Sequence, residues 1–121
     1  MAMILIVEDN SFIRELAEMT IQDWGYDTLS AGSLDEALIL LRSSQVIDLL
    51  FTDIYLGTAV FGGCELAQQA IELRPNLCVL YTTGNYVTDK IKSQFIDGMQ
   101  CLHKPYTSTQ LQHSLAELLA A

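Results

Sequence analysis

The stretch Ile4-Leu5-Ile6-Val7-Glu8-Asp9-Asn10 places four aliphatic residues in a row and closes them with two acids and an amide. An aliphatic run without polar alternation predicts a strand that is buried on both faces. Such strands belong to parallel sheets, in which a helix must cross over between successive strands. Apolar residues then recur at helical spacing from Ile13 to Trp24, with Gly25 as the stop, so the segment predicts a strand followed by a helix.

The same alternation continues to the end of the chain. Further strands are expected at 28–31, near a sheet edge, and at 49–51, 77–81 and 99–102. Further helices are expected behind a Ser33–Glu36 capping box and around 66–71, 87–95 and 111–119. Five strands alternating with five helices predict an α/β fold with a single doubly wound parallel sheet and helices on both faces. Without a repeat or linker, we expect one domain over residues 1–121.

Composition narrows the class of protein. The 121 residues carry a net charge of -9, which disfavours nucleic acid as a partner, and 50% of them are hydrophobic, which excludes a disordered acidic tail. The longest stretch without a charged residue, 75–88, contains several polar residues, so no membrane span is expected. The three cysteines, Cys64, Cys78 and Cys101, form no C-x-x-C pair and favour buried free thiols in the cytoplasm.

Polar side chains stand where the predicted strands end. Glu8 and Asp9 follow the first strand, Asp53 the third, Thr83 the fourth and Lys104 the fifth. In open parallel sheets, ligands bind beyond the carboxyl ends of the strands. We therefore expect these five side chains to converge on one edge of the sheet.

The chemistry of this set indicates a cation and a phosphate. Three neighbouring carboxylates repel one another, and oxygen ligands without Cys or His select a hard cation, with Mg²⁺ ahead of Zn²⁺. Lys104 and the Thr83 hydroxyl would then contact phosphoryl oxygens. One carboxylate would be the nucleophile that forms an aspartyl-phosphate, and Asp53 is the better candidate because it ends the central strand.

In order and position, these motifs resemble the receiver domain of bacterial response regulators. The resemblance covers essentially the whole chain and implies the flavodoxin-like strand order 2-1-3-4-5. It implies that Asp53 accepts a phosphoryl group from a sensor histidine kinase or a histidine phosphotransfer protein. Mg²⁺ would be held by Asp9, Asp53 and the backbone carbonyl of Tyr55, with Glu8 acting mainly through a bound water.

The resemblance also implies a switch. Thr83 and Lys104 would contact the phosphoryl group and, by shifting toward it, alter a surface that a downstream protein recognises. The Lys104–Pro105 peptide bond would be cis. Position 101, where the family usually carries an aromatic switch residue, holds Cys101, and Tyr86 or Tyr106 are candidate substitutes.

The loop after Asp53 also departs from the family pattern. It carries Gly57 where a proline is common, and it reaches the next helix about two residues late. A longer loop without proline should be more mobile. Tyr55 and Asn85 flank the acceptor at positions that tune how fast water removes the phosphoryl group.

Other functions stay open beside this one. A phosphatase of the haloacid-dehalogenase type needs a second acid two residues after its nucleophile, where this chain has Ser11 and Tyr55. A flavin or nucleotide module is disfavoured because Glu8 and Asp9 would repel its phosphate. A receiver-like docking scaffold that is never phosphorylated is the remaining alternative. We expect no turnover of an external substrate, only Mg²⁺-dependent self-phosphorylation and autodephosphorylation, and the flank of the last helix is a candidate homodimer surface.

Overall fold

Five parallel strands form one sheet in the computed structural model, which describes residues 2–57, 62–84 and 87–120. The strands are β1 (Met3–Val7), β2 (Asp27–Ala31), β3 (Leu49–Asp53), β4 (Cys78–Thr83) and β5 (Gln100–His103). Their order across the sheet is β2-β1-β3-β4-β5, and every pair is parallel. The expected fold class and strand order are confirmed, and β2 lies at an edge as predicted.

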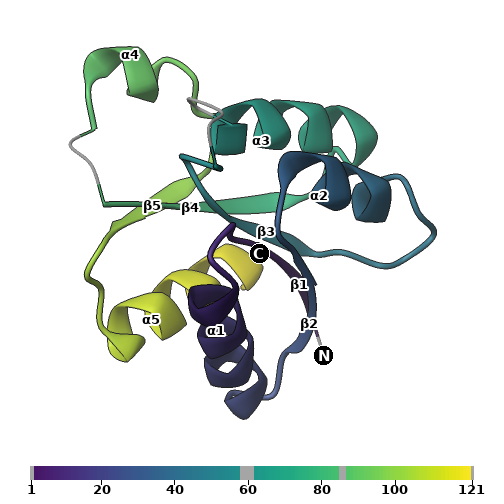
Figure 1. Cartoon of the computed structure of the whole chain (residues 1–121), viewed down its shortest axis with the longest axis vertical. Helices are drawn as coiled ribbons and strands as arrows, with labels where there is room; N and C mark the ends of the chain where they lie inside the picture. Colours follow the sequence, from purple (N-terminus) through teal and green to yellow (C-terminus); the bar gives the residue numbers. More distant parts are fainter. Residues whose placement is uncertain (1, 58–61, 85–86, 121) are drawn as a thin grey trace.

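The helices cover both faces of the sheet. They are α1 (Ser11–Asp23), α2 (Leu34–Leu41), α3 (Gly62–Leu73), α4 (Asp89–Lys92) and α5 (Ser108–Leu119). Helices α1 and α5 lie on one side of the sheet, and α2, α3 and α4 lie on the other (Figure 1). Within the described residues, no helix is long and apolar enough to cross a membrane.

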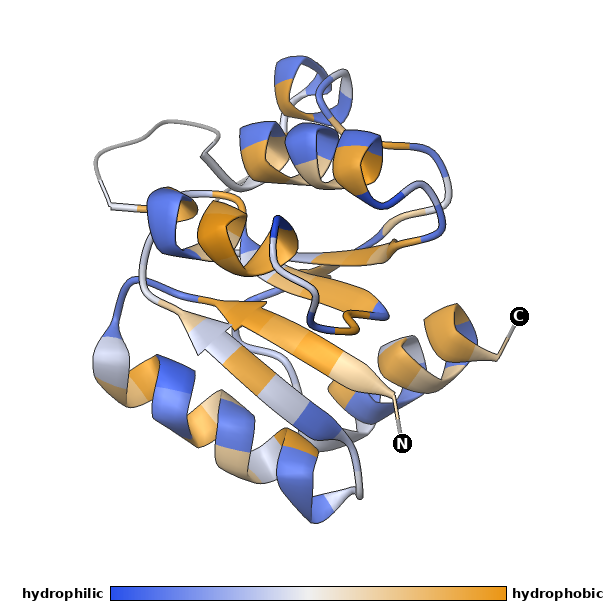
Figure 2. Ribbon diagram, turned by 90° about the vertical axis from the view of Figure 1, so that its right-hand side faces the viewer, coloured by the Kyte–Doolittle hydropathy of each residue, from blue (hydrophilic) through white to orange (hydrophobic). Residues whose placement is uncertain are grey.

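Each face of the sheet has its own core, because successive strand residues point to opposite sides. One core joins Ile4, Ile6, Leu49, Phe51 and Leu80 to α1 and α5, and the other joins Leu5, Val7, Leu50, Val79 and Tyr81 to α2, α3 and α4. The central strands are accordingly apolar along their length in Figure 2. Burial on both faces explains the unbroken aliphatic run that opens the sequence.

Local capping fixes where the helices begin. The Asn10 side chain accepts a hydrogen bond from the Ile13 N–H and caps α1. The Ser33 capping box is only half formed, because the Glu36 carboxylate accepts from the Gly32 N–H. A complete capping box joins Thr107 to Gln110 at the start of α5.

Helix α4 is much shorter than the spacing of Val87, Ile91 and Phe95 predicts. The α-helix spans only Asp89–Lys92. After it, the Gln94 N–H bonds to the Ile91 carbonyl and the Phe95 N–H to the Lys92 carbonyl, so the chain tightens into i to i−3 turns. The prediction of a helix reaching Phe95 was therefore wrong, and the tightened turn lets the Phe95 ring pack inward.

Candidate functional site

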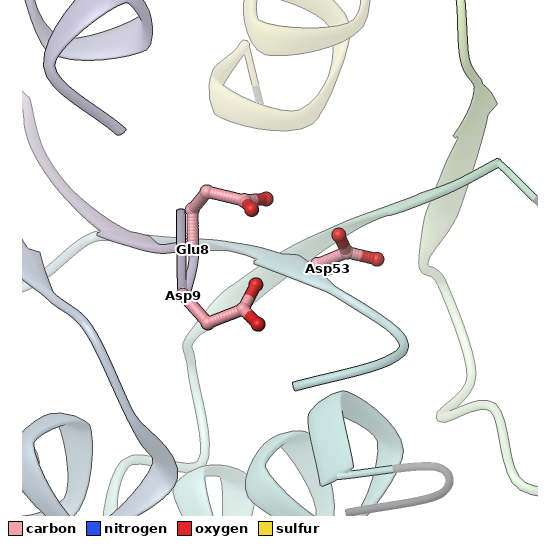
Figure 3. Close-up of side chains that lie close together, drawn as sticks. All are labelled: Glu8, Asp9 and Asp53. Carbon is pink, nitrogen blue, oxygen red and sulfur yellow. The ribbon is translucent and has the colours of Figure 1, made fainter. Parts of the chain in front are cut away.

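The ends of β1 and β3 bring three carboxylates together. Glu8 and Asp9 follow β1, and Asp53 is the last residue of β3. Each residue offers one oxygen, and these oxygens all lie within 4.8 Å of one another. The side chains point into a common space in Figure 3. Strands β1 and β3 are direct neighbours in the sheet, which accounts for this convergence.

Lys104 supplies the positive charge of the cluster from the end of β5. Its ammonium lies 2.8 Å from Asp53 Oδ2 and 3.4 Å from Glu8 Oε2. Burial works against the charged form of Lys104, but hydrogen bonding and attraction from Asp53 and Glu8 outweigh it and raise its pKa. The ammonium is therefore held charged between two acids.

Glu8 is the most buried of the three acids, with 7% of its surface exposed. Burial is the main cause that raises its pKa, although the Asn10 N–H and the Lys104 charge act in the opposite direction. The Asn10 N–H donates to Glu8 Oε1 at 3.2 Å. Both carboxylate oxygens of Glu8 thus have protein partners, Asn10 on one and Lys104 on the other.

Asp9 is exposed, and the loop after β3 reaches over to it. The Gly57 N–H donates to Asp9 Oδ2 at 3.0 Å, with Gly57 at a φ of 58. Proline has no N–H and cannot adopt that φ, so glycine at this position allows a contact that the family's common proline would exclude. The Tyr55 N–H lies 3.3 Å from Asp53 Oδ1, so the same loop also contacts the central carboxylate.

The start of α3 packs directly on the backbone of Asp53. The Gly63 N–H donates to the Ile54 carbonyl at 2.8 Å. A Cβ at Gly63 would stand 2.0 Å from the Asp53 carbonyl oxygen, closer than atoms can approach. Glycine is required at position 63 because the backbone of Asp53 approaches so closely, and the adjacent Gly62-Gly63 pair is the sequence signal of this approach.

Thr83 ends β4 and is buried, and its carbonyl accepts from the Lys104 N–H at 2.8 Å. This bond ties the end of β4 to the residue that binds Asp53. The residue in register with Asp53 is Thr82, which lines a small cavity of about 20 Å³ together with Asp53, Lys104 and Tyr106. Thr82 and Tyr106 are site neighbours that the strand-end rule missed, because that rule sees only the last residue of a strand.

The remaining predicted positions lie around this core. The Lys104–Pro105 bond is cis. Cys101 is half-buried on β5, beside Tyr81 of β4 in register. Tyr106 packs edge-on against Phe51 with ring centroids 6.4 Å apart, on the face that carries α1 and α5. Tyr106 therefore lies on the opposite face of the sheet from Cys101 and does not occupy the position of the family's aromatic switch residue. The other candidate, Tyr86, lies outside the described residues, as does Asn85.

The donor set fits Mg²⁺. It consists of carboxylate oxygens from Glu8, Asp9 and Asp53. Among the described residues, these three form the one group of acidic, cysteine or histidine side chains that lie close enough together to hold a metal ion. Hard oxygen donors without nitrogen or sulfur suit Mg²⁺ and Ca²⁺ better than Zn²⁺. Lys104 compensates one charge and leaves the cluster negative, which favours a divalent cation.

Comparison with known proteins agrees with this geometry. A family model of the response regulator receiver domain matches residues 4–116. The chain is 27% identical over 118 residues to the autoinducer 1 sensor kinase/phosphatase LuxN of Vibrio campbellii, covering 96% of this chain and 13% of that protein. It spans between 12% and 45% of the length of these and other curated relatives, which include sensor histidine kinases and transcriptional regulatory proteins.

Solved structures are similar over nearly the whole chain. A response regulator receiver protein from Sinorhizobium medicae superposes with a TM-score of 0.90 at 29% identity, covering 99% of this chain and 95% of that one. A response regulator from Burkholderia pseudomallei, solved with a phosphorylated aspartic acid, calcium ion and citrate, gives a TM-score of 0.82 at 25% identity and covers 95% of this chain and 66% of that one.

Proposed function

The chain belongs to the family of response regulator receiver domains, and from that premise we propose that Asp53 accepts a phosphoryl group in a Mg²⁺-dependent reaction. The donor is the phosphohistidine of a sensor histidine kinase or of a histidine phosphotransfer protein. One observation carries the proposal: the Asp53 carboxylate belongs to a cluster of three acids and lies 2.8 Å from the Lys104 ammonium. A nucleophile, a cation site and a fixed positive charge are the parts that phosphoryl transfer requires.

Asp53, Lys104 and Thr83 have different roles in phosphoryl transfer. An Asp53 oxygen attacks phosphorus, the bond from phosphorus to the histidine nitrogen breaks, and the leaving imidazole takes a proton from solvent. Lys104 exchanges its contact with Asp53 for one with a phosphoryl oxygen, and Thr83 donates its hydroxyl to another. Bound Mg²⁺, held by Glu8, Asp9, Asp53 and the Tyr55 carbonyl, would supply charge neutralisation on the phosphoryl group.

An apolar stripe on α1 is the surface we assign to the donor protein. Phe12, Leu16 and Met19 are exposed by 73%, 54% and 63%, although they are large apolar side chains. The stripe borders the site, because Ile13 and Ala17 of α1 line the same small cavity as Asp53 and Lys104. A groove of about 200 Å³ continues between α1 and α5. A helix that carries the phosphohistidine could bury this stripe while its imidazole reaches Asp53.

With these roles, the chain acts as a signalling switch rather than as an enzyme for an external substrate. The acyl phosphate on Asp53 is lost by hydrolysis in the same site, and its presence changes the surface offered to a downstream protein. The cysteines of the chain are free, which is consistent with the reducing cytoplasm where we place this reaction.

Intact-protein mass spectrometry tests the proposal. Incubation with acetyl phosphate and Mg²⁺ should add one phosphoryl group that is lost at alkaline pH, and Asp53→Asn should take none. Asp23→Asn, which removes an exposed acid at the end of α1, is the matched control and should be labelled like the wild type. Absence of an adduct on the wild type, with both acetyl phosphate and a phosphorylated donor protein, would favour the docking scaffold instead.

A further inference from the structure

An arginine beside the acidic cluster bonds to the main chain rather than to a carboxylate. Arg14, in the first turn of α1, donates from Nη1 to the Glu8 carbonyl oxygen at 2.8 Å. In the part of the chain that the structure describes, no ion pair joins Arg14 to an acid, although Glu8 and Asp9 precede it closely in sequence. A guanidinium bonds more strongly to a carboxylate than to a carbonyl. The main-chain contact therefore points to a role in positioning rather than in charge pairing.

The Glu8 carbonyl belongs to the peptide unit that joins the two acids. Because a peptide unit is planar, the direction of this carbonyl fixes the plane from which Asp9 leaves the end of β1. Strand β1 ends at Val7, and no backbone N–H of the described residues donates to the Glu8 carbonyl. The bond from Arg14 is therefore the contact that holds this peptide plane and, through it, the direction of the Asp9 side chain.

Gly32 supplies the space in which the guanidinium lies. It directly follows β2, which pairs with β1 in the sheet. A Cβ at Gly32 would stand 2.9 Å from Arg14 Nη1 and 3.6 Å from Arg14 Cζ, so a side chain at this position would displace the guanidinium. The φ of Gly32 is outside the positive range, so its backbone conformation suits other residues as well. What glycine provides at position 32 is room for Arg14.

We propose that Arg14 and Gly32 are a pair of positioning residues for the cation site formed by Glu8, Asp9 and Asp53. Arg14 holds the Glu8–Asp9 peptide plane so that both carboxylates face Asp53. Gly32 keeps the guanidinium on the carbonyl and away from the carboxylate oxygens. A guanidinium displaced by a side chain at position 32 is free to pair with those oxygens and then competes with the cation. Because the pair acts on a cation site, the inference rests on the proposed Mg²⁺-dependent function.

Position and charge predict opposite effects when Arg14 is removed. Arg14→Met deletes a positive charge near the acids, and electrostatics alone would then tighten the binding of Mg²⁺. A positioning role predicts weaker binding, because the Glu8 carbonyl loses its partner and the Glu8–Asp9 peptide plane is free to turn. We expect the dissociation constant of Mg²⁺ to rise by about threefold or more in Arg14→Met, the change that loss of one ordinary hydrogen bond produces.

Titration of MgCl₂ into the full ¹⁵N-labelled chain, followed through its amide resonances, tests the pair. The Gly57 N–H donates to Asp9 Oδ2 at 3.0 Å, so its resonance reports the position of the Asp9 carboxylate before any cation is added. This resonance should shift in metal-free Arg14→Met and in metal-free Gly32→Ala. Arg42→Met makes the same chemical change at an exposed position at the C-terminal end of α2, and it should leave both the resonance and the dissociation constant unchanged.

Combining the two substitutions separates positioning through Arg14 from a local effect of the new methyl group. Gly32→Ala should weaken Mg²⁺ binding by about threefold or more in the wild type. In Arg14→Met the same substitution should have no effect, because the guanidinium that it displaces is absent. Unweakened binding in Arg14→Met, no weakening by Gly32→Ala, or an equal effect of Gly32→Ala in both backgrounds would overturn the inference and leave the proposed function intact. A wild type that does not bind Mg²⁺ would remove the proposed function and this inference with it.

Discussion

Replacing Asp9 by asparagine should stabilise the protein in the absence of Mg²⁺ and remove most of its response to Mg²⁺. Asp9 contributes one of three carboxylates whose oxygens lie within 4.8 Å of one another. At 4.8 Å two unit charges repel by about 0.9 kcal/mol in water and by about 3.5 kcal/mol at an effective dielectric near 20. Asp9 is exposed, so the lower figure applies to each of its two acidic neighbours.

Two smaller effects oppose this relief. Asparagine keeps an oxygen for the Gly57 N–H, so that contact becomes a neutral hydrogen bond rather than being lost. The substitution also removes the attraction between the Asp9 carboxylate and the Lys104 ammonium. This attraction is weak, because the direct partners of Lys104 are Asp53 and Glu8. We expect Asp9→Asn to raise the free energy of unfolding by about 1 kcal/mol without Mg²⁺.

Urea unfolding followed by Trp24 fluorescence, at constant ionic strength, measures both effects. At a Mg²⁺ concentration a hundredfold above its dissociation constant, the wild type should gain about 2.7 kcal/mol. Asp9→Asn should gain far less, because one ligand is gone. Asp23→Asn makes the same change in net charge away from the site and should respond to Mg²⁺ like the wild type. If Asp9→Asn were less stable than the wild type without Mg²⁺ and equally stabilised by it, the acidic cluster would not be a cation site.

Three further outcomes follow from other parts of the structure. Leu16→Glu, on the α1 stripe, should slow phosphotransfer from a histidine donor by about tenfold or more, equivalent to about 1.4 kcal/mol of lost contact. Labelling by acetyl phosphate, which needs no docking, should stay unchanged. An equal loss in both assays would argue against docking of the donor on α1. Gly57→Pro should lower the free energy of unfolding by about 1–2 kcal/mol, measured in urea, since it removes the N–H to Asp9 and forbids the positive φ. Burial raises the pKa values of both Cys64 and Cys101 from 9.0 to about 11, so an unfolded chain loses these protons first. Cys64 alone should then lower the free energy of unfolding by about 1.4 kcal/mol per pH unit between those values. In Cys64→Ala the decline measured in urea should be shallower by that amount, and an identical slope would contradict the assignment.

Strand ends were the most predictable part of the molecule. The aliphatic run before Glu8 and the buried strand before Asp53 have a pattern that is local in sequence, and parallel strands bring their carboxyl ends to one edge regardless of detail. For this reason, the sequence alone assigns Glu8 and Lys104 to one cluster, although 96 positions separate them.

Features set by side-chain packing were not predictable in this way. Val87, Ile91 and Phe95 have helical spacing, yet the α-helix ends at Lys92 and the Phe95 ring stacks on Tyr81. Thr82 and Tyr106 enter the site through strand register and through ring packing against Phe51. Register and rotamer are tertiary properties, which hydrophobic periodicity does not encode.

The contact between Gly63 and the backbone of Asp53 has a consequence for how the protein tolerates mutation. A methyl group there would collide with the acceptor's own carbonyl, so even alanine must push the main chain of Asp53 or dislodge the first turn of α3. A random screen for lost signalling should therefore recover Gly63 variants that retain Glu8, Asp9, Asp53, Thr83 and Lys104 intact. In such variants the acceptor would still be present but displaced, a defect that inspection of the reactive side chains alone would overlook.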